Sequence, residues 1–205
     1  MNFPMSRSWK KASLTVVTLG VAAAIAMANP AASTPVGAGS SGTTGFGRNA
    51  ALSQTSGHIN WLVPSDGPYP TIHKGDDIAI YVSISRQRVT IFRGMQVIYM
   101  MVASTGIDDA NGDGTPHGTF YIQRQRGTFF YAPGEKEGAR YWVSWLHHGE
   151  YLFHSVPVDR ENHIIVSEAM KLGHEASHGC VRLTVPDAHW FYQNIPYHAR
   201  VMIGE

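Results

Sequence analysis

The stretch from residue 78 to residue 84 limits most strongly what this chain can fold into. Ile78, Ile80, Val82 and Ile84 alternate with other residues. Successive side chains of a strand point to opposite faces, so a period of two predicts a strand with one buried face. Such a strand leaves backbone N–H and C=O groups unpaired until neighbouring strands bind them. The chain is therefore expected to contain a β-sheet.

Six further short segments have the composition of strands and are separated by turns, several of which contain glycine. They are residues 89–92, 96–103, 118–123, 141–146, 150–154 and 200–203. Arg93-Gly94-Met95 separates the first two segments and predicts a hairpin. Short strands at close spacing predict a mainly β fold, an antiparallel β-sandwich or open barrel.

Helix signals occur in two places. Thr184, with Asp187 three residues later, resembles a capping box and predicts a helix that ends near Asn194, before Pro196. A second short helix is expected over residues 166–172, ended by a glycine. The predicted fold is therefore mainly β with one or two short helices.

The N-terminus has the features of an export signal. Arg7, Lys10 and Lys11 precede the apolar run 12–28, which ends in the small-x-small pattern Ala26-Met27-Ala28. These features predict a signal peptide over residues 1–28 and an exported protein of the periplasm or cell wall. An uncleaved membrane anchor is the alternative, although the run is shorter than the roughly 20 residues of a stable span.

Residues 29–57 are rich in Gly, Ser, Thr and Ala without an apolar period, which predicts a flexible linker. Residues 58–205 remain as one domain, long enough for a hydrophobic core. The formal net charge is +1 and no basic patch appears, which argues against nucleic acid as a partner. A membrane is expected as a partner only if the N-terminal segment is retained.

Cys180 is the only cysteine, and it ends the run Ser177-His178-Gly179-Cys180, with His154 upstream. A thiolate attacks carbonyl carbon, and a neighbouring imidazole can take the thiol proton. Gly179 allows a sharp turn before the sulfur, and backbone N–H groups at such a turn can point at a developing oxyanion. Cys180 is therefore a candidate nucleophile with a histidine as its base.

Two other interpretations of Cys180 stay open at this point. A lone cysteine is most often a small buried hydrophobic residue. A zinc site is the second, but one cysteine with irregularly spaced histidines matches no familiar ligand spacing. The pattern Asp109-x-Asn111-x-Asp113-Gly114 resembles the start of a calcium loop, yet Phe120 stands where a glutamate is needed, so a turn is predicted. No metal and no cofactor is predicted.

Three elements in the same order resemble the L,D-transpeptidase catalytic domain, a YkuD-like family that cross-links bacterial peptidoglycan. They are Ser104-Thr105-Gly106, the run Thr-Pro-His-Gly-Thr-Phe-Tyr-Ile at 115–122, and Ser177-His178-Gly179-Cys180 with His154-Ser155 upstream. The resemblance covers roughly residues 76–205. It implies the open β fold of that family and a cysteine acyltransferase without a cofactor.

The resemblance also implies roles for individual residues. His154 corresponds to the family's catalytic histidine, and Ser155 to the residue whose carbonyl group orients that imidazole. His178 belongs to the site, either for proton transfer or for holding the cysteine loop. Ser177 is assigned to substrate binding. Arg182, where many members have Asn, either binds a peptide carboxylate or braces the loop.

The implied reaction is acyl transfer from a peptidoglycan stem tetrapeptide. Cys180 would displace the terminal D-Ala, and an amine of a second stem peptide would then form a 3→3 cross-link. Water as the acceptor would make the protein an L,D-carboxypeptidase, and a different amine would attach a wall protein. A non-catalytic wall-binding module and a zinc hydrolase are alternatives from other classes.

Two features bear on the substrate cleft. The interval between His154 and Ser177 is 22 residues, longer than is usual in the family, so residues 158–170 look like an insertion over or beside the cleft. The aromatic run 129–131, with Trp142 and Trp145, either lines the donor groove or belongs to the core, the more usual place for alternating aromatics in a β protein.

Overall fold

The computed structural model describes residues 58–108 and 114–205. The candidate signal peptide, the candidate linker and residues 109–113 of the predicted turn lie outside the described residues. Within the two described ranges, no helix is long and apolar enough to cross a membrane.

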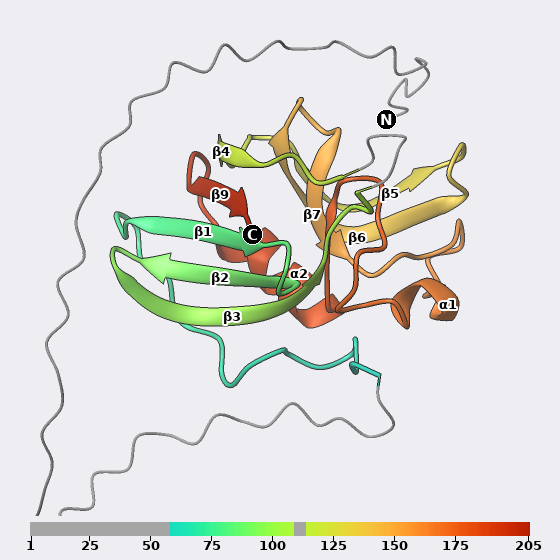
Figure 1. The fold of residues 1–205 in the computed structure, drawn as a ribbon, viewed down its shortest axis with the longest axis horizontal. Helices are drawn as coiled ribbons and strands as arrows, with labels where there is room; N and C mark the ends of the chain where they lie inside the picture. Colours follow the sequence, from blue (N-terminus) through green and yellow to red (C-terminus); the bar gives the residue numbers. More distant parts are fainter. Residues whose placement is uncertain (1–57, 109–113) are drawn as a thin grey trace, which may run out of the picture. The chain divides into compact units, whose positions relative to one another are not determined.

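Nine strands of the described part form a single sheet (Figure 1). In chain order they are β1 (Ile78–Ser83), β2 (Arg88–Arg93), β3 (Gln96–Ser104), β4 (Gly118–Tyr121), β5 (Arg126–Ala132), β6 (Glu137–Leu146), β7 (Tyr151–Ser155), β8 (Val181–Leu183) and β9 (Arg200–Gly204). Their order across the sheet is β4-β9-β1-β2-β3-β8-β7-β6-β5.

The sheet is mixed. Strand β1 pairs in parallel with β9, and β7 pairs in parallel with β8, whereas the other neighbouring pairs are antiparallel. Parallel neighbours need a long connection because the chain must return to the end at which it started. Between β7 and β8 this connection is the segment that the sequence marks as an insertion.

The sheet curls until its β4 end approaches β6. The Phe120 ring on β4 packs edge-on against the Trp145 ring on β6, with centroids 4.9 Å apart. Beyond β4, the Gln123 N–H donates to the Ser144 carbonyl at 2.7 Å, and the Ser144 N–H donates to the Gln125 carbonyl at 2.9 Å. The prediction of a mainly β, open-barrel fold is confirmed, with a mixed sheet in place of a fully antiparallel one.

Helix α2 (Val185–Asn194) packs against the β6 and β7 strands of the sheet (Figure 1). The Thr184 hydroxyl accepts a hydrogen bond from the Asp187 N–H at 3.2 Å, as the capping pattern predicts. The Phe191 ring of α2 packs on the Phe153 ring of β7, with centroids 4.5 Å apart. Both rings are fully buried, and burial of such a side chain stabilises the fold by about 1.5–3 kcal/mol.

Helix α1 (Val166–Ala169) is shorter than the expected helix over residues 166–172. Hydrogen bonds from Lys171 to Glu168 and from Leu172 to Ala169 continue the chain as a tight turn. Gly173, with φ +95°, ends it, which is the position where the sequence predicts the stop.

The segment 58–72 ahead of β1, here called the strap, is fastened to α2 by a buried carboxylate. Ser65 Oγ and Tyr69 Oη donate to the Asp187 carboxylate at 2.5 and 2.8 Å. The Tyr69 ring also stacks on Trp190, with centroids 5.5 Å apart. Asp187 is fully buried, so these two donors replace its lost hydration.

Asp187→Ala is expected to lower the free energy of unfolding by about 2–3 kcal/mol, because it leaves the Ser65 and Tyr69 hydroxyls without an acceptor. Urea unfolding followed by fluorescence would measure the change. Asp77→Ala, at an exposed carboxylate, is the control and should stay within about 0.5 kcal/mol of the parent protein. Equal midpoints for the two variants would contradict the assigned role.

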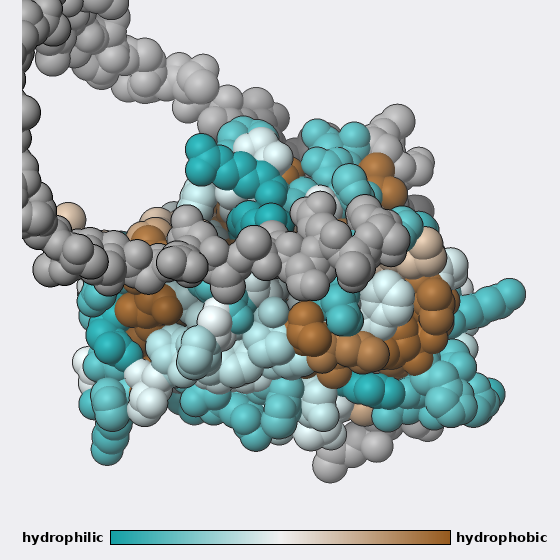
Figure 2. Space-filling model, turned by 90° about the horizontal axis from the view of Figure 1, so that it is seen from below, coloured by the Kyte–Doolittle hydropathy of each residue, from teal (hydrophilic) through white to brown (hydrophobic). Residues whose placement is uncertain are grey.

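The face in Figure 2 is largely hydrophilic, with hydrophobic surface in separate areas. Exposed apolar side chains of the described residues include Met95, Val97, Met100, Val166 and Met170. Scattered apolar side chains of this kind are normal on the surface of a folded domain.

Candidate active site

Strands β7 and β8 place the candidate base beside the residues that follow the candidate nucleophile. In their parallel register, Phe153 lies beside Val181, and His154 lies beside Arg182. Phe153 and Val181 belong to the hydrophobic core. Because alternate side chains of a strand point to opposite faces, His154 and Arg182 share the other face. Cys180 directly precedes β8 and lies two residues before Arg182, the spacing at which side chains of an extended chain point to the same face.

Cys180 ends a tight turn that Ser177 holds closed. Ser177 Oγ donates to the Cys180 carbonyl at 2.6 Å and accepts from the Gly179 N–H at 3.1 Å. Gly179 has φ +114°, which residues with a Cβ rarely adopt. A Cβ at this position would lie 2.6 Å from Cε1 of Tyr151. Conformation and space therefore both require glycine, and the Gly179 N–H is used within the turn.

Gly179→Ala is expected to displace the turn and to slow alkylation of Cys180 by iodoacetamide by about tenfold or more, since small displacements at a reactive centre have large effects. Gly149→Ala is the matched control, because Gly149 has φ +115° but no heavy atom within 4 Å of an added Cβ. The control should lose about 1–3 kcal/mol of folding free energy through backbone strain, without the contact with Tyr151 that slows alkylation in Gly179→Ala. Equal alkylation rates in the two variants would show that the contact with Tyr151 is unimportant.

The other two elements of the family resemblance pack against this turn. The Ser177 N–H donates to the Thr105 carbonyl at 3.1 Å. Thr115 Oγ1 donates to the Gly179 carbonyl at 3.0 Å and accepts from the Gly106 N–H at 2.8 Å. The Ser-Thr-Gly element and the start of the Thr-Pro element thus support the cysteine turn from outside.

Cys180 is partly exposed as a residue, and its thiol lies against the backbone that enters β7. The Leu152 N–H donates to Sγ at 3.3 Å, and Sγ lies 3.6 Å from the Glu150 carbonyl oxygen. Burial raises the pKa of the Cys180 thiol to about 11, although the Leu152 N–H and the Arg182 charge act in the opposite direction. The thiol is therefore protonated at neutral pH in the resting structure.

The His154 imidazole is buried and oriented by the backbone. Its Nδ1 lies 2.6 Å from the carbonyl oxygen of Ser155. A carbonyl only accepts, so Nδ1 carries the hydrogen and Nε2 keeps its lone pair. Burial and the Arg182 charge lower the pKa of His154 to about 4, while the hydrogen bond to Ser155 acts the other way. The Phe130 ring stands edge-on to the imidazole, with centroids 6.0 Å apart.

A neutral imidazole on β7 and a protonated thiol just before the neighbouring strand β8 define the chemistry available to the site. The imidazole has a free lone pair for the thiol proton, and the thiol has no preformed charge. If this thiol acts as a nucleophile, it must lose its proton during the attack. From the sequence, a thiolate formed by a neighbouring imidazole is expected, whereas both groups are uncharged in the resting structure.

Arg182 is buried and forms two ion pairs. Its Nη1 lies 2.9 Å from Glu168 Oε2, and its Nη2 lies 3.1 Å from Glu137 Oε2. Of the two roles that the sequence left open for Arg182, this arrangement corresponds to bracing. Glu137 and Glu168 were missed by the sequence reasoning because neither belongs to a recognisable motif.

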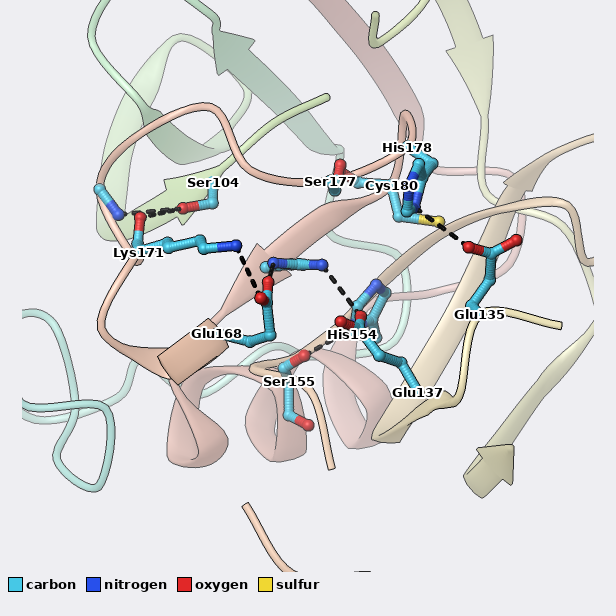
Figure 3. A network of polar contacts seen from close by, with 12 residues as sticks. Ser104, Glu135, Glu137, His154, Ser155, Glu168, Lys171, Ser177, His178 and Cys180 are labelled. Carbon is cyan, nitrogen blue, oxygen red and sulfur yellow. Dashed lines mark hydrogen bonds and ion pairs between the residues drawn. The ribbon is translucent and has the colours of Figure 1, made fainter. Parts of the chain in front are cut away.

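His178 lies beside Cys180 and points outward (Figure 3). Its Nδ1 is 3.8 Å from Glu135 Oε2, on the turn between β5 and β6, and both side chains are largely exposed. His147, His148, His163 and His174 are also exposed. Among the described residues, no group of three or more His, Cys, Asp or Glu side chains is arranged to hold a metal ion.

The aromatic segment divides between core and site. Trp142 and Trp145 are buried, as the core interpretation expects. Phe129 is 40% exposed, and Phe130 contacts His154. The segment therefore forms one side of the surroundings of the imidazole.

One hollow adjoins residues that support the cysteine turn. It has a volume of about 360 Å³, and its lining includes Gly106, Thr115 and Tyr151. Thr115 and Tyr151 also contact Gly179. Thr115 and Tyr151 therefore both line the hollow and contact the cysteine turn.

Known families and proteins resemble this chain in sequence. Residues 77–203 match the family model described as the L,D-transpeptidase catalytic domain. The Bacillus subtilis (strain 168) protein named "Putative L,D-transpeptidase YciB" is 50% identical over 146 residues, which cover 71% of this chain and 75% of that protein.

Two solved structures share the fold. An L,D-transpeptidase from Mycobacterium smegmatis has a TM-score of 0.51 at 19% identity, over 64% of this chain and 60% of that one. An L,D-transpeptidase from Mycobacterium tuberculosis H37Rv has a TM-score of 0.51 at 21% identity, over 64% and 59%. The chain thus spans about three fifths of these structures. Because the family model matches more than half of its residues, the chain belongs to the L,D-transpeptidase catalytic domain family.

Proposed function

We propose that this protein is a peptidoglycan L,D-transpeptidase with Cys180 as its nucleophile and His154 as its base. The observation that carries the proposal is that the parallel β7–β8 pair brings a thiol at the end of a glycine turn and a neutral imidazole, whose Nδ1 is held by Ser155, to adjacent strands. The family acts on peptidoglycan peptides, so the donor is a stem tetrapeptide and the leaving group is D-Ala.

In the first half-reaction, the Cys180 sulfur attacks the carbonyl carbon between the third stem residue and D-Ala. His154 Nε2 takes the thiol proton while the S–C bond forms. The C–N bond then breaks, and the D-Ala amine leaves with the proton from His154. The product is a thioester on Cys180.

In the second half-reaction, an amine of a neighbouring stem peptide attacks the thioester. His154 takes a proton from this amine and returns it to the sulfur as the S–C bond breaks. The new amide is a 3→3 cross-link. If water attacks instead, the same steps release a tripeptide.

Intact mass of the purified protein after incubation with a carbapenem tests the nucleophile. This β-lactam acylates by ring opening, so the adduct keeps the full mass of the reagent. We expect one adduct per chain, placed on Cys180 by peptide mapping. A Cys180 that iodoacetamide alkylates but the carbapenem leaves unmodified would count against a site that accepts acyl donors.

Incubation with purified stem-tetrapeptide muropeptides tests the acceptor. Dimers with 3→3 links and released D-Ala are the expected products in the mass spectrum. Tripeptide monomers alone would instead indicate an L,D-carboxypeptidase. Unchanged tetrapeptides, with Cys180 reactive toward the carbapenem, would contradict peptidoglycan as the donor.

We further propose that the reaction takes place outside the cytoplasmic membrane, in the periplasm or cell wall. The support is the leader of Arg7, Lys10, Lys11 and the apolar run 12–28. Cell fractionation with N-terminal sequencing would test this. A cytosolic protein that retains Met1 would contradict it.

A further inference from the structure

Arg182 belongs to a cluster of four charged side chains, which is more than is needed to brace the cysteine loop. The Arg182 side chain is 5% exposed, and its guanidinium contacts two carboxylates that are themselves 26% and 17% exposed, those of Glu137 and Glu168. Glu168 also accepts from Lys171 Nζ at 2.6 Å. Two cations and two anions therefore form one formally neutral cluster. Its Lys171 end is half exposed, whereas its Arg182 end is buried, and there a charge acts over a longer range than in water.

Rigid parts of the fold hold both carboxylates. Glu137 is the first residue of β6, and Glu168 lies on α1 within the segment inserted between His154 and Ser177. Ala169 and Leu172 fix that segment by packing with Val102 and Val156 in a second hydrophobic cluster. In Figure 3, Glu168 lies on one side of Ser155, and Glu137 lies on the other side, near His154.

Arg182 lies next to both reacting groups. It is the register partner of His154 across the parallel β7–β8 pair and stands two residues after Cys180. The other charged or titratable groups near Cys180 are Glu150 before β7 and the exposed pair of His178 with Glu135. Arg182 is therefore the buried charge closest in the fold to the thiol and imidazole among these groups.

We propose that Glu137 and Glu168 are positioning residues that hold the Arg182 guanidinium beside Cys180 and His154 and moderate its charge there. The inserted segment 158–170 thereby becomes part of the active site, since it contributes one of the two carboxylates. The proposal rests on the proposed role of Cys180 as nucleophile.

The electrostatics of the site agree with this geometry. Burial raises the pKa of Cys180, and the positive charge of Arg182 opposes this rise. Burial lowers the pKa of His154, and the charge of Arg182 lowers it further. Burial raises the pKa of Glu137 although Arg182 lowers it. Burial also opposes ionisation of Glu168, but hydrogen bonds from Lys171 and Arg182 prevail and lower its pKa.

The test is the pH profile of Cys180 alkylation by iodoacetamide, a neutral reagent, in the full chain. Glu168→Gln keeps an acceptor for Arg182 but removes a negative charge. The profile should move to lower pH by about one unit. At pH 8 alkylation should become about threefold faster, because the gain in thiolate outweighs its lower nucleophilicity. Arg182→Gln should move the profile in the opposite direction.

Glu161→Gln is the matched control, since Glu161 is an exposed carboxylate of the same inserted segment. It should leave the profile unchanged. Thermal unfolding of each variant shows whether it is folded at the temperature of alkylation. Glu137→Gln provides the same test from β6, with the same expected direction, should Glu168→Gln unfold.

Opposite shifts of the alkylation pH profile in the glutamate variants and in Arg182→Gln would support the proposal that the carboxylates moderate the charge of Arg182. A shift in the same direction for both, or no shift for either glutamate variant, would overturn the proposal, because loosening of the turn alone affects both alike. Alkylation reports on the thiol and does not require transpeptidation. A protein that shows these shifts but forms no carbapenem adduct would refute the proposed function while supporting the cluster.

Discussion

Replacing Cys180 with alanine is expected to abolish acylation by a carbapenem and to lower cross-linking of stem peptides by at least about a thousandfold. The reason is that Cys180 is the only cysteine of the chain, so no other thiol can form the thioester. Intact mass and product analysis of the same purified sample would measure both losses together.

The fold should survive this substitution. Within residues 58–108 and 114–205, the sulfur makes two weak polar contacts, with the Leu152 N–H and the Glu150 carbonyl. Hydrogen bonds of Ser177 and Thr115, which do not involve the sulfur, hold the turn. A thermal midpoint close to that of the parent protein would separate lost chemistry from lost structure. Full turnover by a folded Cys180→Ala protein would exclude every thioester mechanism for this site.

His154→Gln is expected to slow carbapenem acylation by about 10²–10⁴-fold, the usual contribution of a positioned general base. Glutamine keeps an N–H donor for the Ser155 carbonyl but has no basic atom. The rate constant for adduct formation by stopped-flow or timed mass spectrometry measures the loss. His163→Gln, at an exposed histidine, is the control and should react like the parent protein.

The pH dependence provides a second test of the same residue. The pKa of His154 is lowered to about 4 and that of Cys180 is raised to about 11, so between these values the imidazole is neutral and the thiol protonated. The parent protein should therefore react at a nearly constant rate from pH 6 to 9. In His154→Gln the reactive form is the rare thiolate, and the rate should rise about tenfold per pH unit. A bell-shaped parent profile centred near pH 7 would instead indicate a preformed ion pair.

The inserted segment of residues 158–170 does more than lengthen the interval between His154 and Ser177. The sequence predicts a position over or beside the cleft. In the structure, the segment belongs to the crossover between the parallel strands β7 and β8, and it carries Glu168 to Arg182. A change in this segment would then alter the reactivity of the thiol as well as access to it.

Features that depend on neighbouring residues could be predicted from the sequence. Alternation along Ile78 to Ile84 predicted β1, Thr184 with Asp187 predicted the start of α2, and Pro196 predicted its end, because side-chain period, capping and proline are local signals. The glycine before Cys180 predicted a sharp turn for the same reason. The family resemblance followed from short motifs whose order is readable along the chain.

Strands β5 and β8 were not foreseen. Strand β5 lies at the edge of the sheet, and its residues are half-buried or exposed, so it has no alternating apolar face. Strand β8 has only three residues and directly follows the cysteine. Neither presents a period long enough to distinguish a strand from a loop.

The sequence by itself therefore determined the mainly β class, the capped helix, the glycine turn and the thiol and imidazole of the candidate site. The tertiary structure alone decided the parallel register of β7 with β8, the neutral resting state of the Cys180–His154 pair, and the partners of Arg182. These properties depend on burial and on contacts between residues far apart in the chain. Glu137 and Glu168 are ordinary surface residues by sequence, and only the curled sheet and the crossover bring them to one guanidinium.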